Sequence, residues 1–442
     1  MKINQFPGLF TVGRKDSLAV NYERMKLEFG NGLFDFMPRS YVVPEQKEEL
    51  EKVMKQPGAK PLIVKPPNWF CGIGIKLINK VEDIPDKKNK MVVQEYIDNP
   101  FLIRGTKFDL RLYVLMTGID PVKIYIYENG LVRFATQEYT NDPSQLENNF
   151  IHLTNYSVNK TSETFEYNEH PGSYEGHKWD LQTLWKYMDE EMGIDWKPVW
   201  EKTKEVCVKT VLCGQEHMAK EFSKQMKSDY SCYKLWGFDV MYDDKLKPWL
   251  LEVNNIPSLH INTLDAYVNR PLVAEMFNIV GLHVPKVLGT KHHRAVLETF
   301  GLSKETVPQL GFDKRLYSRQ RVDQDQEKRL RVAKQLELSL QTPCTSPDLF
   351  LDELSPADVR TLVQAEDELS QCYGWTRAFP TPHHSSSDSS ADELLPLLKG
   401  DTYSDMLLAA WEKKYWKDRS AGREVLADLC KEGRHLVVPQ TQ

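Results

Sequence analysis

Two apolar segments, each carrying acidic residues, constrain the fold of this 442-residue chain more than any other feature. Asp239 interrupts LWGFDVM (235–241), and WLLEVN (249–254) contains Glu252 and ends on Asn254. Side chains alternate between the two faces of a strand, so Glu252 and Asn254 are predicted to share one face. Burying an unpaired carboxylate is costly, so acids with apolar neighbours need a partner. The segments therefore predict two strands that hold a polar site.

This polar site has two interpretations. Two carboxylates and an amide oxygen on one sheet face are the hard oxygen ligands that Mg²⁺ prefers, as when the ion is held together with phosphates. The alternative is a polar sheet edge whose acids are solvated. We favour a metal site with Asp239, Glu252 and Asn254 as ligands, because their apolar neighbours indicate partial burial.

The segment KFDLRLYVLM (107–116) predicts a second two-faced strand. Its apolar residues face one way, and Lys107, Asp109 and Arg111 face the other. A charged face of this kind suits anion binding in a cleft, and it suits cross-strand ion pairs on a solvated face equally well. Both interpretations stay open for this segment alone.

Lys65 ends the apolar segment LIVK and precedes a glycine-bearing turn, Gly72-Ile73-Gly74. An ammonium group at a strand end can meet a phosphate, and the N–H groups of a turn can approach the same anion. The segment has neither a Walker loop nor a dinucleotide fingerprint. Taken alone, the turn is more typical of a structural hairpin.

A third polar segment, HLTNYSVNK (152–160), has few charges. It suits either a binding loop or an irregular connection with many bonds from side chains to the backbone. Arg133 and Lys178 are single cations, and a single cation is most often a surface residue.

The pattern along the chain predicts three small domains and an extension. Residues 59–160 are rich in strand patterns, with Glu128-Asn129-Gly130 predicting a hairpin. Residues 161–178 predict a mobile loop, and 179–224 predict helices. We expect an N-terminal domain (1–58), a central domain (59–160), a C-terminal domain (161–285) and a largely helical extension (286–442) that contains a flexible linker, HHSSSDSSADE (383–393).

The composition predicts a soluble intracellular protein. Hydrophobic residues make up 41% of the chain, and its seven cysteines show no metal-ligand spacing. The N-terminus lacks the apolar core of a signal peptide, and no apolar run approaches the roughly 18 residues of a membrane span. The net charge of −6 means that an acidic partner must meet a local basic patch. We expect a monomer without nucleic-acid or membrane partners.

The order of these motifs is that of an ATP-grasp ligase: a phosphate lysine, the segment MVVQEYI, the Lys-Asp-Arg strand and finally the acidic strand pair. From INQFPGLF onward, the chain resembles the tubulin–tyrosine-ligase-like glutamylases over essentially its whole length, and two segments of the extension are similar to the fourth, polyglutamylase type. The segments that carry the resemblance are GRKD (13–16), IVKPP (63–67), GIGI (72–75), VVQEYI (92–97), GTKFDLRLYVL (105–115), GLVRFAT (130–136), FIHLTNYSVNK (150–160), GHKW (176–179), LWGFDVM (235–241), PWLLEVN (248–254), SPADVRTLVQAEDELS (355–370) and WEKKY (411–415).

The resemblance implies a mixed α/β ATP-grasp ligase fold with α+β lobes. It implies an ATP-dependent ligase that adds free L-glutamate through isopeptide bonds to glutamate side chains of tubulin tails, by way of an acyl phosphate. The implied cofactors are ATP and two Mg²⁺ ions, and the implied partner is tubulin or the microtubule. The implied location is the cytoplasm and cytoskeleton, including the cilium or basal body.

The resemblance also implies a role for each matching residue. The ATP contacts are Lys65, Cys71, Gly72, Gln94, Glu95, Tyr96, Ile97, Lys107, Phe108 and Asp109. The metal ligands are Asp239, Glu252 and Asn254. The incoming amino acid meets Arg133, Thr154, Asn155, Ser157, Lys178 and Arg270, and the catalytic cations are Arg133, Lys178 and Lys107. Three places depart from the family. Cys71 replaces an arginine, and the chain reads VNNIPSL (253–259) where relatives usually read VNISPSL. Asn269-Arg270 stands where relatives carry a lysine, with Arg270 one residue out of register.

Two other functions fit the same residues. A glycine ligase would use the same chemistry with a closed, small amino-acid pocket, and a microtubule-binding adaptor would keep the fold without the reaction. Residues 314–334 concentrate lysine and arginine, and we weigh a solvated charged helix equally against a helix that docks on the negatively charged microtubule.

Overall fold

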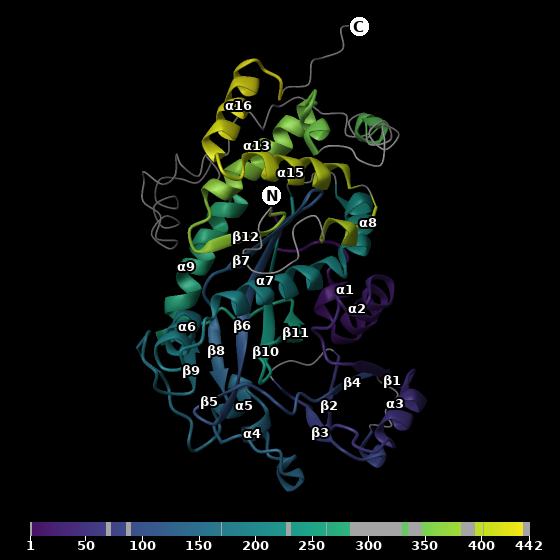
Figure 1. Cartoon of the computed structure of the whole chain (residues 1–442), viewed down its shortest axis with the longest axis vertical. Helices are drawn as coiled ribbons and strands as arrows, with labels where there is room; N and C mark the ends of the chain where they lie inside the picture. The colour runs from purple at the N-terminus through teal and green to yellow at the C-terminus, as the bar shows by residue number, and fades with distance from the viewer. Residues whose placement is uncertain are drawn as a thin grey trace, which may run out of the picture.

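The computed structural model describes the chain in ten segments: residues 2–67, 72–84, 90–168, 170–226, 231–261, 263–282, 329–334, 347–381, 394–400 and 402–435. Two antiparallel sheets, one small and one large, organise these residues (Figure 1). Among the described helices, none is long and apolar enough to cross a membrane.

The small sheet has four strands in the order β1-β4-β2-β3. They are β1 (Ser40–Val43), β4 (Met91–Glu95), β2 (Leu62–Lys65) and β3 (Lys76–Ile78). Alternate residues such as Val64 and Val93 form an apolar cluster that includes Leu50 of helix α3 (Lys47–Met54). The intervening residues, including Ile63, Lys65 and Gln94, line a cleft on the opposite face.

The large sheet has the order β11-β10-β6-β7-β12. Strands β5 and β8 also pair with the first part of β6, and β9 pairs with β8. Its strands are β5 (Leu102–Ile103), β6 (Thr106–Ile119), β7 (Val122–Tyr127), β8 (Leu131–Phe134), β9 (Lys178–Asp180), β10 (Lys234–Tyr242), β11 (Pro248–Asn254) and β12 (Trp375–Phe379). The predicted strands at 107–116, 235–241 and 249–254 are therefore confirmed.

The hairpin predicted at Glu128-Asn129-Gly130 is absent from the described structure, because both flanking strands pair with strand β6. This strand is 14 residues long, and its first half pairs with β8 while its second half pairs with β7. The two strands that flank Asn129 thus both pair with β6 instead of with each other, and the predicted hairpin is wrong. The Asn129 side chain accepts hydrogen bonds from the N–H groups of Gly130 and Leu181, which stabilises this connection.

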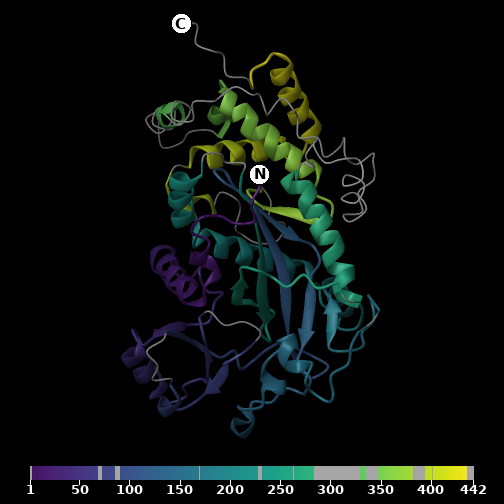
Figure 2. The same ribbon diagram turned by 180° about the vertical axis from the view of Figure 1, so that it is seen from behind.

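Helices cover both faces of the large sheet. Helix α7 crosses one face in front of the sheet in Figure 1, and α9 runs along the other face, nearest the viewer in Figure 2. The α-helices among the described residues up to 282 are α1 (Phe10–Gly13), α2 (Lys15–Phe29), α3, α4 (Asn149–His152), α5 (Tyr156–Asn159), α6 (Leu181–Glu190), α7 (Lys197–Leu212), α8 (Gln215–Gln225) and α9 (Thr263–Val280). Helices are thus present within the predicted range 179–224.

The extension contributes one strand, β12, to the large sheet and also forms a layer of helices. Helices α13 (Pro356–Ser370), α15 (Tyr403–Tyr415) and α16 (Arg419–Lys431) share an apolar cluster. Strand β12 pairs antiparallel with β7, with Trp375 opposite Tyr127. Buried Glu368 of α13 accepts hydrogen bonds from three side chains of β6 and β7: Thr117, Lys123 and Tyr125.

The domain boundaries stay a prediction. Strand β6 lies within the predicted central domain and β10 within the predicted C-terminal domain, and the two strands pair directly. The predicted linker at 383–393 lies outside the described residues, as does most of the basic segment 314–334. Its last residues, 329–334, are helical, and Arg331 pairs with Asp120 at 3.4 Å.

Candidate functional site

A cleft lies between the two sheets, and its empty space, including space open to solvent, is about 600 Å³. Both sheets contribute to it, because β2 and β4 line one side while β6, β10 and β11 line the other. The lining residues are Pro38, Ile63, Lys65, Ile75, Gln94, Glu95, Tyr96, Ile97, Lys107, Asp109, His152, Leu153, Thr154, Asn155, Asp239, Met241, Leu251 and Glu252.

Two buried lysines face the cleft from opposite sheets, and both have neutral hydrogen-bond partners. Lys65 Nζ donates to Gln94 Oε1 at 2.7 Å and to the Leu251 carbonyl oxygen at 3.2 Å. Lys107 Nζ donates to the Tyr96 hydroxyl at 2.9 Å and lies 4.3 Å from the centre of that ring. Nearby carboxylates, Glu252 for Lys65 and Asp109 for Lys107, favour the charged forms only in part against the effect of burial. These buried ammonium groups therefore suit a polyanionic ligand.

Burial lowers the pKa of Lys65 to about 8 and the pKa of Lys107 to about 7. If these lysines bind a triphosphate, only their protonated forms attract it. We therefore expect kcat/KM for ATP to fall as pH rises through about 7 to 8, because this ratio reports the free enzyme. The kcat should begin to fall only at a higher pH than kcat/KM does, because bound phosphates keep both lysines protonated. A kcat/KM for ATP that stays flat between pH 6.5 and 9, about the range that spans both pKa values, would contradict this assignment.

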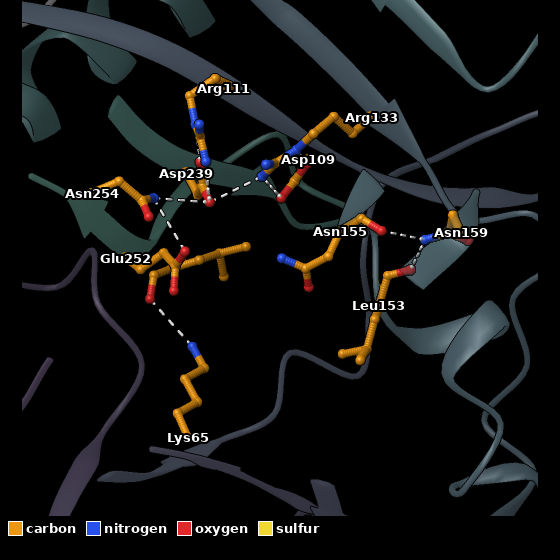
Figure 3. Close-up of polar contacts among 11 residues, drawn as sticks. Lys65, Asp109, Arg111, Arg133, Leu153, Asn155, Asn159, Asp239, Glu252 and Asn254 are labelled. Carbon is orange, nitrogen blue, oxygen red and sulfur yellow. Dashed lines mark hydrogen bonds and ion pairs between the residues drawn. The ribbon is translucent and has the colours of Figure 1, made fainter. Parts of the chain in front are cut away.

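Ion pairs across neighbouring strands form the centre of the site. Strand register places Asp109 opposite Arg133 and Asp239 opposite Arg111. Arg133 Nε lies 2.7 Å from Asp109 Oδ1, and its Nη2 lies 3.0 Å from Asp239 Oδ2. Arg111 Nε lies 2.6 Å from Asp239 Oδ1 (Figure 3). Gly237 makes room for this arginine, because a Cβ there would lie 3.1 Å from Arg111 Cδ.

The two aspartates of this network differ in pKa. Burial raises the pKa of Asp109 above its ordinary value, although Arg133 acts in the opposite direction. Burial also acts to raise the pKa of Asp239, but Arg111 and Arg133 together hold it well below its usual range. Asp239 is therefore a carboxylate at every physiological pH, as a cation ligand must be.

The three predicted metal ligands lie together. Asn254 Nδ2 is 3.1 Å from Glu252 Oε1 and 3.4 Å from Asp239 Oδ2, and Lys15 pairs with Glu252 Oε2 at 3.1 Å. Exchanging the Asn254 amide nitrogen and oxygen would present three oxygens to one ion. Among the described residues, no group of three His, Cys, Asp or Glu side chains is placed to hold a metal. The mixed carboxylate and amide set suits Mg²⁺ by its ligand chemistry.

Only some of the residues predicted to bind the amino acid lie together at the cleft. Lys178 begins β9 and lies opposite Arg133 of β8. Thr154 and Asn155 line the cleft, whereas Ser157 lies on helix α5. Arg270 is exposed on α9, while the neighbouring Asn269 is buried.

Among the predicted ATP contacts, Cys71 lies outside the described residues. Gly72 has a positive φ of 73°, and a Cβ there would lie 3.1 Å from Asn155 Oδ1. Phe108 packs against Phe134 in the hydrophobic core, so its side chain faces away from the cleft. All the other predicted ATP contacts line the cleft.

Sequence reasoning assigned no individual contact with ATP, metal or amino acid to four residues that the structure brings to this region. Arg111 has a visible signal, because it lies two residues after Asp109 on the same strand face. His152 begins the polar segment HLTNYSVNK, whose role stayed open, and Lys15 lies in GRKD, which carries the family resemblance. Asp265 pairs with Lys178 at 2.5 Å. The pattern predicts a helix at 267–280, close to the observed α9, but it does not indicate that the start of this helix meets Lys178.

Comparison with known proteins gives the family. Residues 1–291 match the Tubulin-tyrosine ligase family. Tubulin monoglutamylase TTLL4 of Mus musculus is 36% identical over 438 residues, which cover 98% of this chain and 35% of the relative. Tubulin polyglutamylase ttll-4 of Caenorhabditis elegans is 33% identical over 451 residues, which cover 98% of this chain and 67% of the relative.

Tubulin polyglutamylase TTLL5 of Homo sapiens is 37% identical over 306 residues, which cover 69% of this chain and 24% of the relative. The chain therefore spans about a third or less of these two mammalian relatives. With the family match covering both sheets up to β11, the resemblance and the mixed α/β ATP-grasp fold predicted from the sequence are confirmed. The chain belongs to the Tubulin-tyrosine ligase family.

Proposed function

We propose that this chain is an ATP-dependent ligase that joins glutamate, through isopeptide bonds, to glutamate side chains in the acidic tails of tubulin. The observation that carries the proposal is the concentration of cations at the cleft. Lys65 and Lys107 face it, and Arg133 and Lys178 are cross-strand neighbours beside it. The names of the relatives, tubulin monoglutamylase and polyglutamylase, support the choice of glutamate and tubulin.

The reaction has two steps. The acceptor γ-carboxylate attacks the γ-phosphorus of ATP, ADP leaves, and an acyl phosphate forms. The α-amine of free glutamate then attacks the acyl carbon, phosphate leaves, and the amine gives up a proton. Catalysis of such transfers depends mainly on positioning the reactants and neutralising their charge.

The described residues divide this work between them. Lys65 and Lys107 bind the triphosphate, and apolar lining residues such as Ile63 and Leu251 pack against the adenine base of ATP. Arg133 and Lys178 bind carboxylate groups, which would otherwise repel the phosphates. Asp239, Glu252 and Asn254 would hold two Mg²⁺ ions, which would neutralise phosphate charge when bound.

The proposal includes a cellular setting. The enzyme acts as a monomer on microtubules in the cytoplasm, including those of the cilium or basal body. The basic segment 314–334 docks on the microtubule wall, which its clustered lysines and arginines favour.

The direct test is incubation of the protein with tubulin, ATP, Mg²⁺ and glutamate, followed by mass spectrometry of the tubulin tails. We expect tail peptides heavier by whole glutamate residues, with fragments that place the addition on a side chain. Glycine in place of glutamate distinguishes the glycine ligase, and omission of ATP is the control. ATP-independent binding to microtubules without any mass change would instead support an adaptor.

Lys178 supplies a sharper test of amino-acid binding. A charge-assisted bond to a carboxylate contributes about 1.5–3 kcal/mol, so Lys178→Met should raise the KM for glutamate by about 10- to 100-fold. The KM for ATP should change little. Lys186→Met is the matched control, because Lys186 forms an ion pair with Glu190 on the exposed surface of α6. Equal changes in both KM values would reject the assignment.

A further inference from the structure

Helix α9 supplies an acid to the amino-acid side of the site. Asp265, in the first turn of α9, pairs with Lys178 Nζ at 2.5 Å. The exposed fractions of the two side chains are only 14% for Lys178 and 16% for Asp265. The contact joins the large sheet, which carries Lys178 on β9, to a helix that follows the acidic strand β11 in the chain.

Several charged or polar groups surround Lys178. Arg133 on β8 and Arg111 on β6 are the nearby cations, and the Tyr156 ring on α5 has its centre 4.8 Å from Lys178 Nζ. Asp265 is the acid that faces it from α9. On the sheet, Arg133 pairs with both Asp109 and Asp239, and Arg111 pairs with Asp239. Asp265 is thus a third aspartate in this group, and it pairs with Lys178.

We propose that Asp265 is a positioning residue that holds the Lys178 ammonium group in place, and charged, for a carboxylate of the incoming amino acid. The inference rests on the proposed function, because it gives Lys178 the role of substrate ligand. A lysine ammonium group has three N–H donors. The Asp265 carboxylate takes one and the Tyr156 ring covers one side, which leaves a donor for the substrate.

The charge of Lys178 depends on this contact. Burial lowers the pKa of Lys178, the nearby arginines lower it further, and Asp265 acts in the opposite direction. Asp265→Asn keeps the shape of the side chain and removes its charge. Lys178 should then lose its proton at a lower pH. The KM for glutamate should rise by about tenfold near neutral pH and by more as pH increases, as expected for the loss of a charge-assisted bond. The kcat at saturating glutamate and the KM for ATP should stay close to those of the unchanged protein.

An alternative role for Asp265 predicts the opposite sign. If Asp265 blocks Lys178 and competes with the substrate, Asp265→Asn should lower the KM for glutamate. A purely structural role predicts a loss that is the same at every pH and that extends to ATP. Asp265→Glu keeps the charge, so it should restore most of the glutamate affinity and its pH dependence.

The test has a readout that needs no ligation. Lys178 is labelled with an amine-acylating reagent over a pH series, and the labelled peptide is quantified by mass spectrometry. We expect the labelling midpoint of Lys178 to move to lower pH in Asp265→Asn. Glu190→Gln is the matched control, because it removes the acid from the exposed Lys186 pair and should barely move the midpoint of Lys186.

Two results would overturn the inference: an unmoved labelling midpoint, or a fall in the KM for glutamate. Thermal unfolding of each variant shows whether a loss of glutamate affinity reflects misfolding. If Asp265→Asn is unstable, the KM for glutamate and the labelling midpoint of Lys178 are compared between Asp265→Glu and the unchanged protein. Should the unchanged protein ligate no glutamate while the midpoint still moves, the proposed function fails, whereas the dependence of the Lys178 charge on Asp265 is supported.

Discussion

We expect Glu252→Gln to abolish glutamate ligation and to leave the protein folded. Glu252 lines the cleft. Its Oε2 lies 3.1 Å from Lys15 Nζ, and its Oε1 lies 3.1 Å from Asn254 Nδ2. Glutamine keeps the volume but removes the charge that a divalent cation needs, so we expect ligation to fall by more than about 100-fold. The measurement is the rate of glutamate addition to tubulin, with the midpoint of thermal unfolding recorded in parallel.

The matched control for this change is Glu201→Gln. Glu201 pairs with Lys204 on helix α7, and its side chain has an exposed fraction of 18%, close to the 17% of Glu252. Ligation by this control should stay near that of the unchanged protein. If Glu252→Gln also ligates within a few-fold of the unchanged protein, Glu252 is not a metal ligand.

Glu368→Ala should have the largest effect on stability. Its carboxylate lies 2.6 Å from Lys123 Nζ and 2.8 Å from Thr117 Oγ1, and both Glu368 and Lys123 have an exposed fraction of only 2%. Removing one partner of a buried ion pair typically costs about 3–5 kcal/mol. We expect the free energy of unfolding to fall by this amount, measured by urea denaturation with a spectroscopic readout.

Asp428→Asn on α16 is the control for the extension. Asp428 pairs with Lys431 on the surface, and such pairs contribute about 0–1 kcal/mol. Because Glu368 joins α13 to β6 and β7, the extension should unfold together with the large sheet in one transition. Two separate transitions in the unchanged protein would show that the extension is an independent unit.

The strands of the site could be predicted because their signal is local. The alternation in KFDLRLYVLM places Phe108 and Leu110 in the core and Lys107 and Asp109 on the cleft side, and the structure has this arrangement. The shared face of Glu252 and Asn254 follows from the same two-residue period. These features depend on the geometry of one strand, which the sequence carries directly.

Pairing between distant segments could not be predicted in this way. The Asn-Gly turn at residue 129 suggested a hairpin, but the length of β6 lets it pair with both flanking strands. Arg133 looked like a single cation, yet strand register makes it the partner of two buried aspartates, Asp109 and Asp239. A change at Arg133 therefore leaves two buried carboxylates short of a cation, and its effect extends beyond the amino-acid pocket.

The pairing of β12 with β7 bears on how the protein avoids self-association. The family match ends at residue 291, but the strand that covers the outer side of β7 comes from Trp375–Phe379. A fragment limited to the matched residues would expose the backbone N–H and C=O groups of β7 along a strand whose six residues are all buried in the intact protein. An exposed apolar edge of this kind is a template for pairing with another chain. We therefore expect such a fragment to aggregate more readily than the intact protein.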